Sequence, residues 1–183
     1  MLLIKPYDRA RAVEYARRWA LERNPLFTDF TGQGGNCTNF VSQSVLAGSC
    51  VMNYTPTFGW YYISSTDRAP SWTGVEFFYD FMTTNDGVGP FMRAVRRRNV
   101  EIGDVIQLAN EDGDFYHTLI VTGFEGQAIL VSAQSDDALD RRLSSYNYFS
   151  LRYLHVEGVR VEYPDDTCFE GLIEGTSLPM RPM

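Results

Sequence analysis

The feature that most constrains the fold is a change in hydrophobic period about halfway along the chain. Up to about residue 82, the periodic apolar side chains recur at spacings of three and four, the period of an α-helix. From residue 104 to residue 161 the chain carries short β-branched runs separated by turn residues, which is typical of strands. Helices followed by antiparallel strands predict an α+β fold, with N-terminal helices packed on a sheet.

Three helices are expected in the first half of the chain. Pro25 ends the first, because proline disfavours helical dihedral angles at the residue before it. A glycine-rich turn precedes the second, and Gly48 is the expected residue just past its end. The expected helices cover residues 7–23, 37–47 and about 71–82.

Four strand ranges are expected in the second half, with turn residues between them. They are residues 104–109, 117–122, 128–133 and 152–161. Residues 164–183 are rich in proline, glycine and acidic side chains and are expected to form a peripheral tail. At 183 residues, the chain fits a single domain over residues 1–163, followed by this tail.

Charge and motifs exclude several classes of function. The net charge is −7, so a polyanion such as nucleic acid would be repelled, and the arginine clusters at 93–98 and 141–142 are expected to be solvated. The sequence contains no run of 18 apolar residues, so no membrane span is predicted. No zinc-like spacing, P-loop or dinucleotide motif is present, so no metal or cofactor is expected. The sequence does not indicate an oligomeric state.

The first residues do not resemble a signal peptide. Only four apolar residues, including Met1, precede Lys5, which is too short an apolar segment for export. The default expectation is therefore a cytoplasmic protein, with leaderless export or a trimmed chain as alternatives. In an exported protein Cys50 and Cys168 are expected to pair with each other and leave Cys37 free, and neither is expected to be catalytic.

Cys37 and His117 are the candidates for a nucleophile and a general base. A thiol at a helix start has its pKa lowered by the helix dipole and unpaired N–H groups. His117 opens a strand, and a hairpin centred near residues 125–126 would place Gln134 opposite it. Gln134 is then the expected orienter of the imidazole, with Ser132 and Ser135 as alternatives.

Further side chains are candidates for binding the substrate. The backbone N–H of Cys37 is one expected oxyanion donor, and Gln33 or Asn36 could supply another. A substrate groove could be lined by Trp60, Tyr61 and Trp72, with core packing as the alternative for these aromatic residues. His155 lies between two apolar residues and is expected to be structural.

Several segments resemble the putative amidase domain family of bacteria, which is similar to the papain-like cell-wall hydrolases of the NlpC and CHAP type. The segments are GGNCTNFVSQ, GDVIQL, HTLIVT and LVSAQSDD, within a resemblance that covers roughly residues 7–158. The resemblance implies a papain-like fold, with Cys37 at the nucleophile position and His117 at the base position. In the family pattern the residue before the cysteine is usually acidic, and histidine is often found at position 134. This chain has Asn36 and Gln134 there.

The leading hypothesis is a cysteine-dependent hydrolase of amide bonds that works through a thioester acyl-enzyme. Its substrate would be a peptide, with peptidoglycan stem peptides as one candidate. Acyl transfer to an amine would use the same residues. The alternative from another class is a catalytically impaired peptide-binding or cell-wall-binding module on the same fold, which the change to Gln134 favours.

Overall fold

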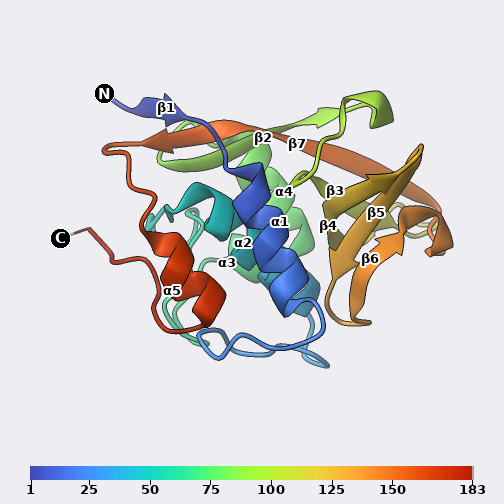
Figure 1. Ribbon diagram of the computed structural model, residues 1–183, viewed down its shortest axis with the longest axis horizontal. Helices are drawn as coiled ribbons and strands as arrows, with labels where there is room; N and C mark the ends of the chain where they lie inside the picture. The colour runs from blue at the N-terminus through green and yellow to red at the C-terminus, as the bar shows by residue number, and fades with distance from the viewer. Residues whose placement is uncertain (183) are drawn as a thin grey trace.

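The helices pack beside one seven-stranded antiparallel sheet in the computed structural model, which describes residues 1–182 (Figure 1). This arrangement confirms the predicted α+β class. The helices are α1 (Arg9–Trp19), α2 (Asn36–Ser49), α3 (Pro70–Thr73), α4 (Val75–Thr84) and α5 (Cys168–Glu174). Two short 3-10 helices, η1 (Arg97–Asn99) and η2 (Leu143–Ser145), connect strands.

Four consecutive strands form an antiparallel meander, and the last strand of the chain pairs with the first strand of this meander. The strands are β1 (Leu3–Lys5), β2 (Gly89–Val95), β3 (Val105–Ala109), β4 (Phe115–Glu125), β5 (Ala128–Ala133), β6 (Ala138–Arg142) and β7 (Ser150–Val161). Their order in the sheet is β1-β7-β3-β4-β5-β6, and β2 also pairs with β7. The long strand β7 therefore joins the meander to β1 and β2 (Figure 1).

Helix α2 lies at the centre of the molecule and is buried along its whole length. It packs against α1, α3 and α5 as well as against β4 and β5. A fully enclosed helix normally lacks polar residues, but α2 carries several, and each must find a partner. Ser42, for example, accepts a hydrogen bond from Trp60 and donates one to the carbonyl of Trp72. Polar residues of α2 thus hold the surrounding aromatic residues in position through hydrogen bonds.

The predicted helices are present, with small differences in their bounds. Helix α2 continues through Gly48, which is glycine because a Cβ there would overlap the ring of Tyr7. It ends at Ser49, and the C-cap residue Cys50 adopts the left-handed conformation with φ of 55°. The expected third helix is two helices, because Gly74 has extended dihedral angles between α3 and α4.

Strands β1, β2 and β6 were not predicted from the sequence. Strand β2 carries Arg93 of the first expected cluster, and β6 carries both arginines of the second. Two of these form ion pairs with glutamates of other strands, Arg93 with Glu157 and Arg142 with Glu125. Charged side chains on short outer strands hide the alternating apolar pattern that identifies a strand.

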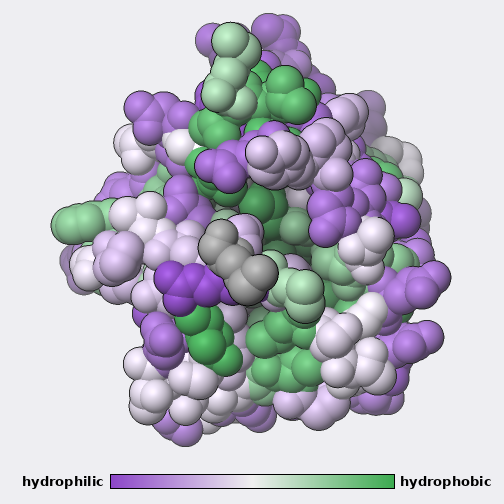
Figure 2. All heavy atoms as spheres, turned by 90° about the vertical axis from the view of Figure 1, so that its left-hand side faces the viewer, coloured by the Kyte–Doolittle hydropathy of each residue, from purple (hydrophilic) through white to green (hydrophobic). Residues whose placement is uncertain are grey.

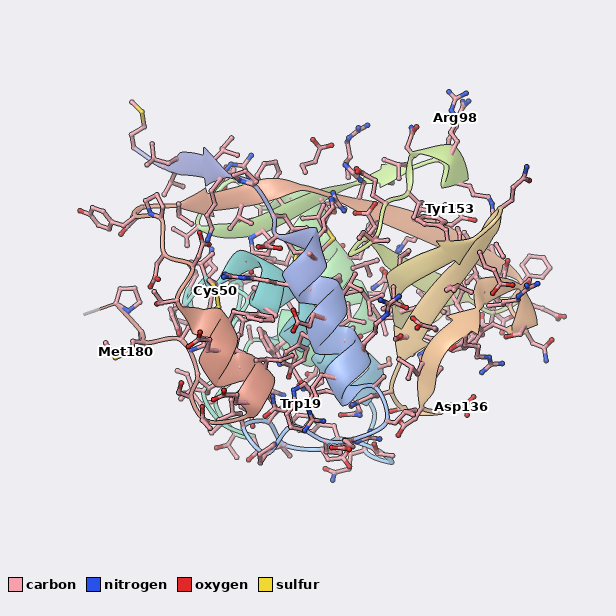
Figure 3. The ribbon with its side chains drawn as sticks, in the orientation of Figure 1. Trp19, Cys50, Arg98, Asp136, Tyr153 and Met180 are labelled. Carbon is pink, nitrogen blue, oxygen red and sulfur yellow. A yellow bond between two sulfur atoms is a disulfide. The ribbon has the colours of Figure 1, made fainter. Side chains whose placement is uncertain are left out.

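The C-terminal segment, expected to be a peripheral tail, includes α5, which packs on α1 and α2. Leu172 of this helix is fully buried. Cys50 forms a disulfide with Cys168, as expected for an exported protein, and Cys37 is the free thiol of the chain. Figure 3 labels Cys50 beside α5, where the bond joins the end of α2 to the start of α5.

Candidate active site

The turn that precedes Cys37 requires glycine. Gly35 has φ of 98°, and a Cβ at this position would lie 2.7 Å from the carbonyl oxygen of Thr73. Because Gly35 has no side chain to cap the helix, the first N–H groups of α2 lack the usual partner. Within residues 1–182 no described hydrogen bond is donated by the backbone N–H of Asn36, Cys37 or Thr38. These N–H groups, with the helix dipole, favour negative charge beside the thiol.

A chain of buried hydrogen bonds holds this turn in place. Each side chain donates to the next: Trp72 Nε1 to Asn39 Oδ1 at 3.0 Å, Asn39 Nδ2 to Asn36 Oδ1 at 3.1 Å, and Asn36 Nδ2 to Gln134 Oε1 at 2.9 Å. Gln134 Nε2 then donates to the carbonyl oxygens of Trp19 and Glu22, at 2.8 and 2.9 Å. The residue before the thiol is thereby tied to the end of α1 through Gln134.

Gln134 does not lie opposite His117, because the predicted register of the hairpin was wrong. Ser132 pairs with Ile120, and the same register continued by two residues puts Gln134 opposite Thr118. The turn lies at residues 126–127, and a bulge follows between Val121 and Gly123. Neighbouring residues of a strand point to opposite faces of the sheet, so a shift of one residue moves Gln134 to the other face.

The hydrogen bonds of Gln134 agree with this corrected register. All of those described join it to Asn36, Trp19 and Glu22, and none reaches His117. The first alternative is also engaged elsewhere, since Ser132 Oγ lies 3.0 Å from Thr122 Oγ1 and accepts from the backbone N–H of Asp140. Ser135 follows β5 in a left-handed conformation with φ of 59°.

His117 is buried near the start of β4 and is uncharged at neutral pH. Burial lowers the pKa of His117 to about 4; the carboxylate of Asp136 opposes this shift, and the guanidinium of Arg141 adds to it. The imidazole packs against the ring of Tyr146, with ring centroids 5.9 Å apart and planes at 51°. In the part of the chain that is described, the imidazole has no hydrogen-bond partner. A neutral imidazole is the form that can act as a base.

Helix α2 and strand β4 meet at the residues that directly follow the candidate pair. Thr38 Oγ1 lies 2.9 Å from Thr118 Oγ1, and both side chains are fully buried. The sulfur of Cys37 lies 3.8 Å from the same Thr38 oxygen. No hydrogen bond between the sulfur and the imidazole is described. The structure therefore brings the two chain positions close together and leaves the reactive groups unpaired.

The expected aromatic groove is not present at Trp60 and Trp72. Both tryptophans are fully buried and pack against each other with ring centroids 4.8 Å apart. Their indole N–H groups are bound by Ser42 and Asn39 of α2, which makes them part of the core. Tyr61 is half-buried against Tyr54, at 5.7 Å between ring centroids.

The two side chains expected to help stabilise an oxyanion differ in their surroundings. Gln33 is exposed in the loop, and its backbone N–H donates to the carbonyl of Phe30. The amide of Asn36 is buried and donates to Gln134, so it is not free to bind a substrate. The backbone N–H groups at the start of α2 remain as donors.

Sequence reasoning missed three parts of this site: the contact between Thr38 and Thr118, the role of Asn39 and the position of Tyr146. The first two had a signal in the sequence, because Thr38 and Asn39 directly follow Cys37 and Thr118 directly follows His117. Tyr146 follows a strand that was not predicted, so nothing in the sequence pointed to it.

A pocket of about 790 Å³ lies at the opposite end of α2 from Cys37. It is lined by residues 50–55, 87–88, 161–163, 165 and 179–182. Figure 2 shows this face of the molecule, where apolar side chains lie in the floor of a hollow. The candidate pair does not line this pocket.

The described residues contain neither a metal-binding cluster nor a membrane span. Residues 1–182 contain no cluster of three or more histidine, cysteine or acidic side chains that could hold a metal ion. Among the same residues, every helix is too short or too polar to cross a bilayer.

Comparisons with known proteins agree with the resemblance to the putative amidase domain family. A family model described as "Putative amidase domain" matches residues 6–156. The chain is 38% identical over 139 residues to the uncharacterised protein YhbB of Bacillus subtilis (strain 168), an alignment that covers 72% of this chain and 42% of that protein. It is 30% identical over 145 residues to YjcM of the same organism, covering 75% of this chain and 33% of that protein.

The chain therefore spans less than half the length of these two curated relatives. No solved structure matches it significantly.

Proposed function

Because the chain belongs to the putative amidase domain family, we propose that it hydrolyses amide bonds with Cys37 as the nucleophile and His117 as the base. The papain-like fold of the NlpC and CHAP type is part of the same proposal. The observation that carries it is the hydrogen bond between Thr38 and Thr118, which holds the start of α2 against β4 beside both candidate residues.

In the proposed reaction His117 takes the proton of the Cys37 thiol, and the thiolate attacks the carbonyl carbon of the scissile amide. The neutral state of His117 at physiological pH suits this first step. The oxygen of the tetrahedral intermediate would be bound by the free N–H groups at the start of α2. His117 then protonates the leaving amine, and water releases the acyl group from the thioester. Closure around a substrate would have to shorten the distance between thiol and imidazole, as is common for catalytic hydrogen bonds.

The substrate that we propose is a peptide, and peptidoglycan stem peptides are the first class to test. Acyl transfer to an amine would proceed through the same thioester and differs only in the group that releases the acyl chain.

A second candidate function is a binding module without catalysis. Two observations favour it: the thiol and imidazole share no described hydrogen bond, and Gln134 is fully engaged with Asn36 and α1. In this alternative the same surface would hold a peptide without cleaving it.

Thiol labelling and product analysis separate the two functions. Cys37 is the free thiol of the chain, so a neutral alkylating reagent reports on it alone in unreduced protein. For the hydrolase we expect Cys37 to react faster than a model thiol at pH 7, and mass spectrometry to find cleaved products from purified peptidoglycan or a peptide library. Cys37→Ala should abolish cleavage. Slow alkylation together with substrate binding but no cleavage would establish the binding module instead.

A further inference from the structure

Tyr146 has a buried hydroxyl beside the candidate base, and within residues 1–182 this hydroxyl has no hydrogen-bond partner in good geometry. The guanidinium of Arg141, which lies over the same ring, is close enough to act on the phenol. The ring of His117 lies next to it, 5.9 Å away between centroids. The imidazole also has no described hydrogen bond in the same part of the chain. Buried polar groups nearly always have a partner, so the unpaired hydroxyl beside the imidazole calls for an explanation.

We propose that Tyr146 is the positioning residue of His117, with its hydroxyl oxygen accepting a hydrogen bond from the imidazole N–H that faces away from Cys37. A hydrogen bond from a ring nitrogen to a phenol oxygen sets the two ring centroids about 6.5 Å apart when the groups are in line. The centroids lie 5.9 Å apart, so a rotation of the imidazole, with the tyrosine ring held in place, would form it. The inference rests on the proposed function, because it gives His117 the tautomer that a base needs.

The segment that carries Tyr146 is held firmly by Arg141. The guanidinium of Arg141 stacks on the Tyr146 ring, 3.8 Å from its centroid. The same side chain donates to Oγ and to the carbonyl oxygen of Ser145, at 2.7 and 3.1 Å, and pairs with Asp136 at 3.5 Å. These contacts fix the tyrosine ring in place, which is what a positioning residue requires.

Because charged groups of both signs already act on His117, a neutral residue is best suited to orient its imidazole. Asp136 and Arg141 act on the imidazole from the β5–β6 side with opposite signs, and Cys37 is the titratable group on α2. Burial raises the pKa of the Tyr146 phenol, so it stays uncharged at neutral pH. A neutral hydroxyl can fix the tautomer without converting the buried imidazole to imidazolium.

The expected orienters have other partners. Gln134 is bound to Asn36 and to α1, and Ser132 to Thr122 and Asp140. Ser135 has no described partner and is therefore the rival that the experiment must include.

The test compares Tyr146→Phe with the matched control Tyr148→Phe and the rival Ser135→Ala. Tyr148 is exposed and lies two residues further along the chain.

The chain has only two histidines, so long-range proton–nitrogen NMR spectra resolve the tautomer of His117 without any substrate. We expect one tautomer in the wild type and a mixture in Tyr146→Phe. We also expect kcat to fall about tenfold with KM unchanged, because the imidazole is no longer held in the tautomer and orientation that a base needs. The other two variants should match the wild type.

Unchanged His117 spectra and kcat in Tyr146→Phe would overturn the inference, as would the same losses in Ser135→Ala. An error in the role of Tyr146 and an error in the proposed function would give different results. If hydrolysis requires Cys37 and His117 but is indifferent to Tyr146→Phe, only the role of Tyr146 is wrong. If the NMR change occurs but the wild type cleaves nothing, the contact exists and the proposed hydrolase function is wrong.

Discussion

The two histidines of this chain lie in opposite kinds of surroundings. His155 Nδ1 lies 2.8 Å from the carboxylate of Asp104, which is fully buried and also binds Arg9 at 2.7 Å. The same carboxylate accepts from the backbone N–H groups of Glu101 and Val156. His117 has the tilted ring of a tyrosine in place of a carboxylate. Taken alone, the His155–Asp104 pair looks more like a catalytic dyad than His117 does.

The difference shows why a hydrogen-bonded histidine is not by itself a sign of catalysis. Asp104 joins the start of α1 to β7 through four hydrogen-bonded partners, so His155 belongs to the framework of the fold. A group whose bonds are all committed to structure cannot exchange a proton without loss of those bonds. His117 has no such commitment, and it lies near the free thiol.

The largest expected effect is the difference in activity between a variant that lacks His117 and one that lacks His155. His117→Ala should lower any amide hydrolysis by about a thousandfold, the usual size of general-base catalysis. It should lower the alkylation rate of Cys37 by at most about thirtyfold, because an unassisted thiol is still a few per cent thiolate at pH 7. His155→Ala should change both rates by less than about threefold at a temperature where the variant is folded. Alkylation kinetics at pH 7, with circular dichroism to verify folding, provide the measurement. Equal loss in both variants would end the distinction between the two sites.

Removal of Asp104 should destabilise the protein more than removal of any charge near His117. Asp104→Ala leaves the partly buried guanidinium of Arg9 without its closest carboxylate, and breaking a buried pair costs about 3 to 5 kcal/mol. The matched control is Asp136→Ala, whose carboxylate is exposed and should change the free energy of unfolding by less than about 0.5 kcal/mol. Urea denaturation measures both. A similar cost for the two variants would show that the buried network contributes little.

The pH dependence of stability should identify His117 directly. Its pKa is about 4 in the folded protein, below the ordinary value of 6.5, so the unfolded chain binds the proton first as the pH falls. Its contribution is fully present above about pH 6.5 and is lost as the pH falls toward 4, by up to about 3 kcal/mol. His117→Gln should flatten this part of the curve relative to the wild type. Parallel curves for the two proteins between pH 4 and 7 would rule out the lowered pKa.

Much of the fold could be predicted from local patterns. The bounds of β5 were predicted correctly from a short β-branched run, and α2 was found from the glycine-rich turn and the stop near residue 48. Strands β2 and β6 were missed because their arginines interrupt the apolar alternation. Their pairing depends on β7 and β5, which lie elsewhere in the sequence, so local patterns could not reveal it.

The site was harder to predict because it depends on register and on partners. A bulge and a turn centred one residue later than expected moved Gln134 to the other face of the sheet. Trp60 and Trp72 lie in the core because their indole N–H groups donate to Ser42 and Asn39 of α2. A sequence pattern would place these two polar residues in contact with solvent. Such pairings are visible only after the elements have packed.

The disulfide has a consequence for a chain that has been cut. The exposed turn at residues 110–114, between β3 and β4, is the kind of place where proteases cleave folded proteins. A cut there would separate the peptide that carries Cys37 from the peptide that carries His117. Cys50 belongs to the first peptide and Cys168 to the second, so the bond between them would keep both fragments in one covalent molecule. A nicked protein would therefore run as two bands on a gel only after reduction.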